Sequence, residues 1–269
     1  AAQKLIPATL ELGGKSANIF FEDCDWEMAM DGLQMGILFN QGQVCCAGSR
    51  VFVQESIYNR FVEEAVKRFN KVKVGLPWEE ETQMGSQIDR RQMEKILKYV
   101  EIGKEEGAKV LCGGVQAKEG ELEKGCFLRP TLLGDVTNDM RVAQEEIFGP
   151  IMPILTYDSL DELIHKINSM PHPLALYFFT RDKVAARKVT SQCQFGGGCI
   201  NDTIIHLATS EMPFGGFGES GMGGYHGHEG FRTFSHYKSI VDKKTWLDLP
   251  MRYQPYRKIY EKLLRKFLK

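Results

Sequence analysis

Short apolar runs alternate with longer amphipathic stretches along this sequence, and that alternation restricts the chain to few folds. Apolar residues three and four positions apart predict helices, whereas short runs rich in β-branched and aromatic residues predict strands. We expect strands over residues 17–21, 50–54, 109–111, 151–157, 174–180 and 198–201, and helices over 26–39, 57–69, 87–107, 160–170 and 183–192. Such alternation predicts an α/β fold, with a mostly parallel sheet flanked by helices.

Charge and composition narrow the class of partner. The chain has 269 residues, of which 43% are hydrophobic and 26% charged, which is enough for a sizeable core. Its formal net charge of -1 gives no concentrated basic surface for phosphates, so we expect no nucleic acid. This charge is more compatible with a small-molecule substrate than with a nucleic acid.

Seven cysteines without CxxC spacing favour a reducing compartment over a disulfide or zinc framework. No run approaches the ~18 to 20 consecutive apolar residues of a membrane-spanning helix. The first residues also lack a charged leader followed by an apolar core. We therefore expect a soluble, cytoplasmic protein that binds no metal.

The last twenty residues differ from the rest. Residues 250–269 hold seven Lys and Arg side chains against one acid, Glu261, and Leu263, Leu264, Phe267 and Leu268 interleave with them at helical spacing. This pattern is typical of a basic amphipathic helix that lies on an anionic membrane surface. A solvated terminal helix packed on its own protein or on a partner subunit is the alternative that we favour.

Two thiols lie in the segment GQVCCAG, between a predicted helix and a predicted strand. Cys45 and Cys46 are candidate nucleophiles if a basic or electropositive neighbour favours the thiolate. A buried cysteine pair that only fills core space is the alternative.

Two acidic segments are candidate partners. In LELGGKS, Glu11 stands among apolar residues, where desolvation would make it a base near neutral pH; a helix-end glutamate before a glycine turn is the alternative. In EEIFGP, Glu146 and Phe148 together suit a ribose and a flat ring, or simply end a loop.

Taken together, these motifs resemble the aldehyde dehydrogenase superfamily. LELGGKS, GQVCCAG, EEIFGP and PFGG occur in the family's order and approximate spacing, and the resemblance covers nearly the whole chain. The stretch from Asn201-Asp202 to His206, PFGGFGESGMGGYHG and FRTFSHYKSIV resembles most the class 3 branch, which includes fatty and aromatic aldehyde dehydrogenases.

The resemblance implies roles for individual residues. Cys45 would attack the aldehyde as nucleophile, and Glu11 would be the general base. Glu146 and Phe148 would bind the nicotinamide ribose and ring of NAD or NADP. Further candidates are Gln92 and Lys95 for cofactor contact, Asn201 for ordering the catalytic loop and Phe214 for lining the aldehyde tunnel.

The motif GFGESG at residues 216–221 spells the dinucleotide fingerprint, but that fingerprint needs a strand before it and a helix after it. We interpret it as a loop near the substrate entrance. Family members carry a cofactor domain ahead of the glutamate motif, so we expect residues 1–14 to be its remnant and residues 15–235 to be the catalytic domain. Residues 236–269 would form a C-terminal strand and the basic tail.

Two functions are compatible with these expectations. The chain would be the catalytic portion of an NAD(P)-dependent aldehyde dehydrogenase, nearly inactive alone because the main cofactor domain is missing, and a homo-oligomer like its family. Alternatively, it would be a non-redox folded domain with weak thiol esterase activity or an assembly role.

Overall fold

The computed structural model describes residues 1–267, including only the backbone of Phe267, and separates into two compact units, Ala1–Phe234 and Ser235–Lys269. The predicted catalytic residues all lie in the first unit.

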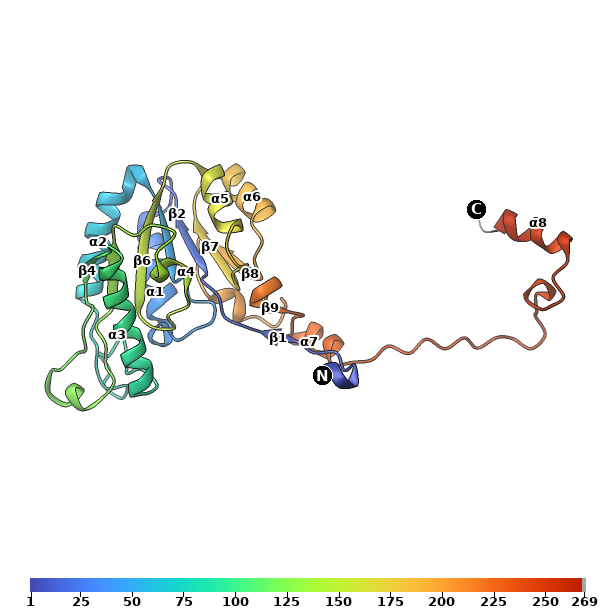
Figure 1. Ribbon diagram of the computed structural model, residues 1–269, viewed down its shortest axis with the longest axis horizontal. Coiled ribbons are helices and arrows are strands. Elements are labelled where there is room, and N and C mark those ends of the chain that lie inside the picture. Colours follow the sequence, from blue (N-terminus) through green and yellow to red (C-terminus); the bar gives the residue numbers. More distant parts are fainter. Residues whose placement is uncertain (268–269) are drawn as a thin grey trace. The chain divides into compact units, whose positions relative to one another are not determined.

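A seven-stranded sheet forms the centre of the first unit (Figure 1). Its strands are β2 (Ala17–Phe20), β3 (Arg50–Gln54), β4 (Lys109–Cys112), β5 (Thr131–Gly134), β6 (Ile151–Tyr157), β7 (Ala175–Phe179) and β8 (Gly197–Ile200). Their order is β4-β5-β6-β3-β2-β7-β8, and all neighbours run parallel except β4 and β5. The expected mostly parallel sheet is confirmed.

Helices cover both faces of this sheet (Figure 1). On one face lie α1 (Trp26–Leu38) and α2 (Tyr58–Asn70); on the other lie α3 (Arg90–Glu105), α4 (Arg141–Gln144), α5 (Leu160–Asn168) and α6 (Lys183–Gln192). Successive strand residues serve opposite faces: Ile19 packs toward α3–α6, and Phe20 packs toward α1 and α2. Strands buried on both faces explain why the sequence shows continuous apolar runs.

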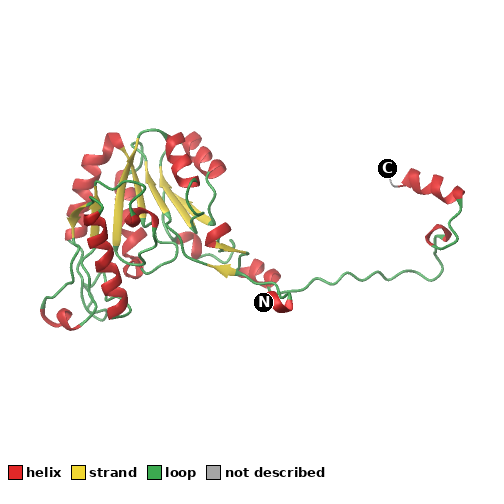
Figure 2. Cartoon of the chain, in the orientation of Figure 1, coloured by secondary structure: helices red, strands yellow, loops and turns green. Residues whose placement is uncertain are grey.

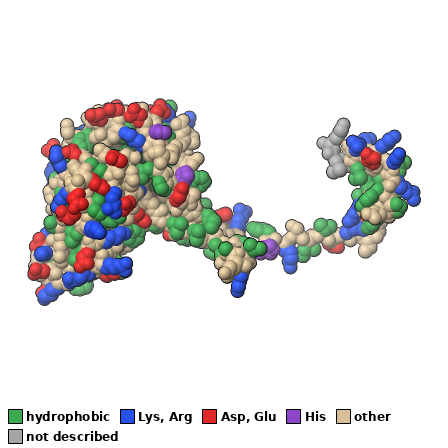
Figure 3. Space-filling model, viewed as in Figure 1, with side chains coloured by type: hydrophobic (Ala, Val, Ile, Leu, Met, Phe, Trp, Pro, Cys, Tyr) green, Lys and Arg blue, Asp and Glu red, His purple; other side chains and the backbone are tan. Residues whose placement is uncertain are grey.

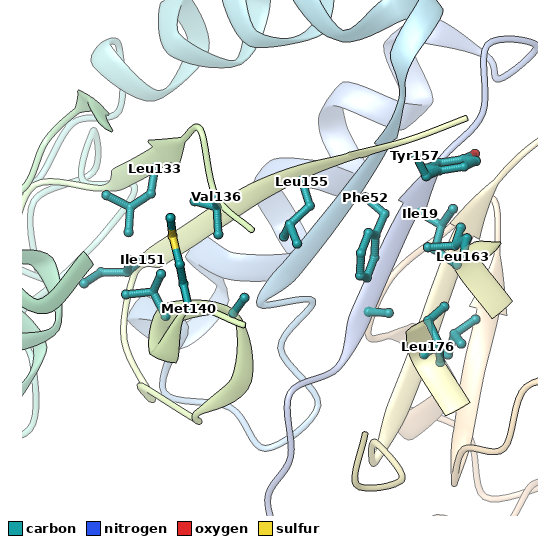
Figure 4. Close-up of a cluster of buried hydrophobic side chains, with 14 of the residues drawn as sticks. Ile19, Phe52, Leu133, Val136, Met140, Ile151, Leu155, Tyr157, Leu163 and Leu176 are labelled. Carbon is teal, nitrogen blue, oxygen red and sulfur yellow. The ribbon is translucent and has the colours of Figure 1, made fainter. Parts of the chain in front are cut away.

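The larger buried cluster lies on the α3–α6 face. Figure 4 shows Ile19, Phe52, Leu155 and Leu176, from four different strands, in this cluster together with Leu163 of α5. Burying each such side chain stabilises the fold by about 1.5–3 kcal/mol. The cluster therefore stabilises the strands of the sheet. The predicted site residues Glu11, Cys45 and Glu146 lie in the segments that lead into the amino-terminal ends of β2, β3 and β6.

Capping residues set where the helices begin. The Asp25 side chain accepts a hydrogen bond from the Met28 backbone N–H at 3.3 Å, and Asp89 accepts one from Gln92 at 2.7 Å. Because Asp89 is the cap, α3 begins at Arg90, three residues later than its apolar pattern predicts. The helix ends just before Gly107, whose φ of 106° is left-handed.

Several short elements were not predicted. Strand β5 has four residues, as do the predicted strands β2, β4 and β8. Strands β1 (Leu10–Glu11) and β9 (Gly221–Met222) pair antiparallel, and α7 (Gly227–Thr233) follows in the glycine-rich region expected to be a loop. Short 3-10 helices lie at Ala2–Lys4, Phe39–Gly42, Glu55–Ile57, Gly120–Lys124, Ile205–Leu207, Gly218–Ser220 and Pro250–Arg252.

The second unit contains the 3-10 helix at Pro250–Arg252 and α8 (Lys258–Phe267). The strand expected there does not form within residues 236–267, where loop joins the two helices (Figure 2). This expectation was wrong in the described part because a strand without a ladder partner is not stable. Leu268 and Lys269 of the predicted amphipathic tail lie outside the described residues. Within residues 1–267, every helix is too short or too polar to cross a bilayer.

Candidate active site

Glu11 is placed by the two-stranded ladder of β1 and β9. It pairs with Gly221, where a Cβ would lie 2.2 Å from the Leu10 carbonyl oxygen, so only glycine fits. The Glu11 side chain is partly buried, and its Oε1 is buried without a hydrogen-bond partner among the described residues. A buried carboxylate oxygen lacking a donor is unfavourable. It marks a place where a proton donor is expected to bind.

Cys45 lies in the loop between the 3-10 helix at Phe39–Gly42 and β3. The loop begins at Gly42, which has a φ of 73° and a backbone so close to Gly149 that a Cβ would lie 2.4 Å from the Gly149 carbonyl carbon. Further along the loop, the Gly48 N–H donates to the Gly36 carbonyl at 2.8 Å. The loop is therefore held at both ends.

The two adjacent thiols differ in accessibility. Cys46 is fully buried, and its backbone carbonyl accepts a hydrogen bond from the Tyr177 hydroxyl at 2.7 Å. Cys45 is only partly buried. The structure therefore makes Cys45 the thiol that a substrate can approach, with Cys46 as its packing neighbour.

Cys45 and Glu11 are direct neighbours. The Cys46 thiol, burial and a hydrogen bond with the Glu11 side chain together raise the pKa of Cys45 well above its usual range. The resting thiol is thus neutral, and a carboxylate lies within hydrogen-bond reach of its proton. We expected a basic or electropositive neighbour for this thiol, and the residue beside it is the carboxylate base Glu11.

Glu146 follows α4 and lies against the glycines after Glu11. Burial raises the pKa of Glu146, while the Gly14 N–H and the ammonium groups of Lys95 and Lys15 oppose that rise. Its Oε1 is buried and lacks a partner among the described residues.

Phe148 has an unusual backbone for an aromatic residue, with a φ of 60°, and a side chain that is 38% exposed. The Gln92 side-chain amide stabilises this turn by donating to the carbonyls of Ile147 at 3.3 Å and Phe148 at 2.6 Å. Gln92 thus supports the Glu146–Phe148 turn, although we predicted a direct cofactor contact. Lys95 lies on α3, where its charge acts on Glu146.

A pocket of about 440 Å³ lies between Phe148 and the residues that precede Cys45. Asn40, Gln41 and Gln43 line one side, and residues 86–88 line another. This pocket connects the aromatic ring predicted to pack on the cofactor with the loop of the predicted nucleophile.

Asn201 lies elsewhere. Its side chain accepts from the Thr180 N–H at 2.8 Å and donates to the Thr180 carbonyl at 3.0 Å, beyond the carboxyl ends of β7 and β8. There it lines a separate pocket of about 490 Å³. The structure does not bring Asn201 together with Cys45, although Ile204, three residues later, packs with Cys46.

Phe214 packs in the cluster that contains Cys46, with Cys45 at its edge. Two imidazoles flank its ring: His206 at 5.6 Å and His226 at 5.8 Å between ring centroids. Phe214 therefore lies beside the two thiols, and its role in lining an aldehyde tunnel stays a prediction.

Sequence reasoning missed two residues near the site. The charges of Glu11 and Cys45 help to raise the pKa of Tyr225, after burial, so the three side chains are neighbours. Lys15 is 5% exposed, and its Nζ lacks a partner among the described residues. In the sequence, only one feature could have indicated Tyr225: it belongs to the glycine-rich motif that contains β9, the strand that pairs with β1. For Lys15 the signal is its place in LELGGKS.

Comparison with known proteins agrees with this arrangement. The profile of the aldehyde dehydrogenase family matches residues 1–240. Human retinal dehydrogenase 2 is 44% identical over 235 residues, which are 87% of this chain and 44% of that protein. Betaine aldehyde dehydrogenase of Mesorhizobium japonicum is 42% identical over 240 residues, covering 89% of this chain and 49% of that protein.

Solved structures show the same likeness. The NAD+ complex of aldehyde dehydrogenase from Bacillus cereus matches with a TM-score of 0.84 and 41% identity, covering 89% of this chain and 48% of that one. The chain spans about half the length of the relatives it matches. From its motifs, its fold and these relatives, the chain belongs to the aldehyde dehydrogenase family.

Proposed function

We propose that this chain is the catalytic portion of an NAD(P)-dependent aldehyde dehydrogenase that oxidises an aldehyde to a carboxylic acid. The observation that supports it best is the contact between Cys45 and Glu11, which come from separate segments of the chain. A thiol and a base within hydrogen-bond reach form the pairing that covalent catalysis requires.

In the first half of the reaction, Glu11 accepts the proton of the Cys45 thiol. The thiolate then attacks the aldehyde carbonyl, and the new carbon–sulfur bond gives a thiohemiacetal. When bound, NAD(P) supplies the acceptor for the hydride that leaves this carbon. A thioester on Cys45 remains. Glu11 then releases the thiol proton to solvent.

In the second half, Glu11 takes a proton from water, and the resulting hydroxide oxygen attacks the thioester carbonyl. The carbon–sulfur bond breaks, the carboxylic acid leaves, and the Cys45 sulfur recovers the proton that Glu11 took from water. Because the Glu11 Oε1 has no partner in the described residues, it is ready to accept from either the thiol or water.

The residues around Glu146 suit the cofactor. Ribose hydroxyls are donors, and the Glu146 Oε1 is a buried acceptor that lacks one. Phe148 faces the pocket of about 440 Å³ and offers an exposed ring for a flat nicotinamide. Gln92 and Lys95 contribute through Phe148 and Glu146 respectively.

We further propose that residues 1–269 alone turn over aldehydes poorly. In this proposal residues 1–14 belong to the cofactor domain, whose remaining residues supply further nucleotide contacts and an oxyanion donor. Loss of one oxyanion donor typically costs ~10² to 10³ in rate.

Location and assembly are part of the same proposal. Seven free thiols favour a reducing, cytoplasmic compartment. We propose a homo-oligomer, by family resemblance. The basic helix α8, around which Lys and Arg side chains gather in Figure 3, favours contact with an anionic membrane surface.

A second function uses the same thiol without redox chemistry. Because Cys45 and Glu11 pair without a cofactor, the chain alone is a candidate for slow hydrolysis of activated esters. Such esterase activity would not require Glu146 or Phe148.

The test is aldehyde-dependent formation of reduced nicotinamide, followed by absorbance, in this chain and in a version extended at its N-terminus. We expect activity mainly in the extended version, loss of activity in Cys45→Ser, and retention of activity in the neighbouring control Cys46→Ala. Activity that survives Cys45→Ser would contradict the assignment. Ester hydrolysis that depends on Cys45 without any aldehyde oxidation would support the second function.

A further inference from the structure

The carboxylate of Glu146 occupies the space that a side chain at position 13 would fill. A Cβ built on Gly13 would lie 1.9 Å from Oε2 and 2.6 Å from Cδ of Glu146, far closer than real contacts. The backbone of Gly13 does not need glycine for its own conformation, because its φ lies outside the left-handed region. The three atoms nearest to that Cβ all belong to Glu146, so a side chain at position 13 would displace the Glu146 carboxylate.

The next two residues also act on Glu146. The Gly14 backbone N–H donates a hydrogen bond to its carboxylate. The Lys15 side chain is 5% exposed, and its Nζ lacks a hydrogen-bond partner among the described residues. Burying an ammonium group in this way is unfavourable unless a nearby negative charge compensates it.

The charges that face Lys15 identify its counterpart. Arg50 of β3 repels it, whereas Glu146 and Glu145, beyond α4, attract it. Glu145 is already paired with Arg141, at 2.8 Å, and with the Tyr99 hydroxyl, at 2.5 Å. Among the described residues, Glu146 has no such ion pair. Its negative charge is therefore the one that compensates the positive charge of Lys15.

We propose that residues 13–15 position Glu146 for cofactor binding. Gly13 leaves the space that the carboxylate occupies, Gly14 fixes it by a hydrogen bond, and Lys15, in its protonated form, supplies the compensating charge. The unpartnered Oε1 is then left to accept from a ribose hydroxyl. This inference rests on the proposed function of Glu146, and it makes the segment that follows the catalytic base part of the cofactor site.

A double-mutant cycle tests the positioning. The protein used is the version extended at its N-terminus. Titration calorimetry with NAD, and without aldehyde, gives the Kd for NAD of Gly13→Ala, of Glu146→Ala and of the double variant. We expect each single variant to raise Kd by about tenfold, and Gly13→Ala to have no further effect once Glu146 is alanine. Gly230→Ala is the control, because a Cβ there meets nothing closer than 3.7 Å.

Lys15→Met tests the charge. We expect a higher Kd and KM for NAD, a kcat within about twofold at saturating NAD, and no change in the exposed-lysine control Lys98→Met. Thermal unfolding checks that each variant is folded. An unchanged Kd in Glu146→Ala would refute the proposed cofactor role itself. If Glu146→Ala weakens binding while Gly13→Ala and Lys15→Met do not, or if Gly13→Ala adds to Glu146→Ala, the positioning inference is overturned.

Discussion

The carboxylate beside Cys45 has two opposite effects on the sulfur. As a base it removes the proton during catalysis, but as a negative charge it helps to raise the pKa of the resting thiol. Glu11→Gln should therefore lower that pKa and speed alkylation of Cys45 at neutral pH several-fold, while slowing aldehyde turnover by ~10² or more. Brief, limiting alkylation followed by mass spectrometry measures the first effect.

The expected pH profile follows from the same pairing. In the unmodified chain, labelling of Cys45 should keep rising as the pH becomes alkaline, because the raised pKa leaves little thiolate near neutrality. The Cys45→Ala variant lacks this thiol, so the labelled peptide that is missing from its mass spectrum is the one that contains Cys45. If Cys45 were labelled more slowly at neutral pH in Glu11→Gln than in the unmodified chain, the Glu11 carboxylate would lower the pKa of the thiol. That result would contradict the predicted rise.

Burial of Lys15 makes stability depend on pH. Burial lowers the pKa of Lys15 from 10.5 to about 7, so between these values the unfolded chain binds the proton that the folded chain releases. The contribution of Lys15 to the free energy of unfolding therefore rises with pH across that window, and the cost of burial is complete below about pH 7.

Lys15→Met should remove this dependence and stabilise the chain at pH 6 by at least about 1 kcal/mol, since one pKa unit corresponds to about 1.4 kcal/mol. Urea unfolding at pH 6 and pH 9 measures it, with Lys98→Met as the control. A Lys15→Met variant that is less stable than the parent at pH 6 would show that the ammonium is well paired in the fold.

Residue identity predicted some of the site and not the rest. The motifs containing Cys45, Glu11, Glu146 and Phe148 could be recognised. The structure places Glu11 near both Cys45 and Glu146, and Phe148 at the pocket of about 440 Å³. The burial of Lys15 could not be predicted, because a lysine beside two glycines normally indicates a solvated turn. The place of Asn201 depends on β7, whose contact with it no local pattern encodes.

At the scale of elements, two functional loops meet backbone to backbone. A Cβ at Gly42 would lie 2.4 Å from the Gly149 carbonyl carbon, and the φ of 73° is itself unfavourable for other residues. Gly42→Ala should therefore displace both the Cys45 loop and the Glu146–Phe148 turn, cost about 1–3 kcal/mol of stability and reduce activity strongly. Chemical denaturation and turnover measure these effects against Gly230→Ala. A Gly42→Ala variant of parental stability would contradict the close approach.

Periodicity predicted the long helices and most strands of the sheet, but it missed the two-residue strands β1 and β9. Helices α1, α2 and α3 have apolar faces several turns long, whereas β1 and β9 have two residues each and exist because they pair with one another. A ladder between residues 10 and 222 depends on tertiary contacts that no window of sequence contains. The pairing that orients the catalytic base was for this reason not predictable.

At the scale of the whole molecule, the second unit contributes a separable surface. In α8, Ile259, Leu263 and Leu264 fall on one side of the helix, and Lys258 and Arg265 fall on the other. We expect the whole chain, but not residues 1–234, to co-sediment with vesicles containing phosphatidylserine and to dissociate at high salt. Leu263→Asp should abolish binding, whereas the polar-face control Glu261→Gln should not. Equal sedimentation of residues 1–234 would show that the helix packs on protein.

The ladder of β1 and β9 carries a further consequence. Side chains alternate between the two sides of a strand, so a shift of register by one residue would turn Glu11 to the opposite side from Cys45. Insertions or deletions between Phe214 and Gly221 should therefore silence the chemistry even where the sheet and its core remain intact. The length of the glycine-rich stretch between Phe214 and Gly221, about two hundred residues downstream, therefore decides on which side of β1 the Glu11 carboxylate lies.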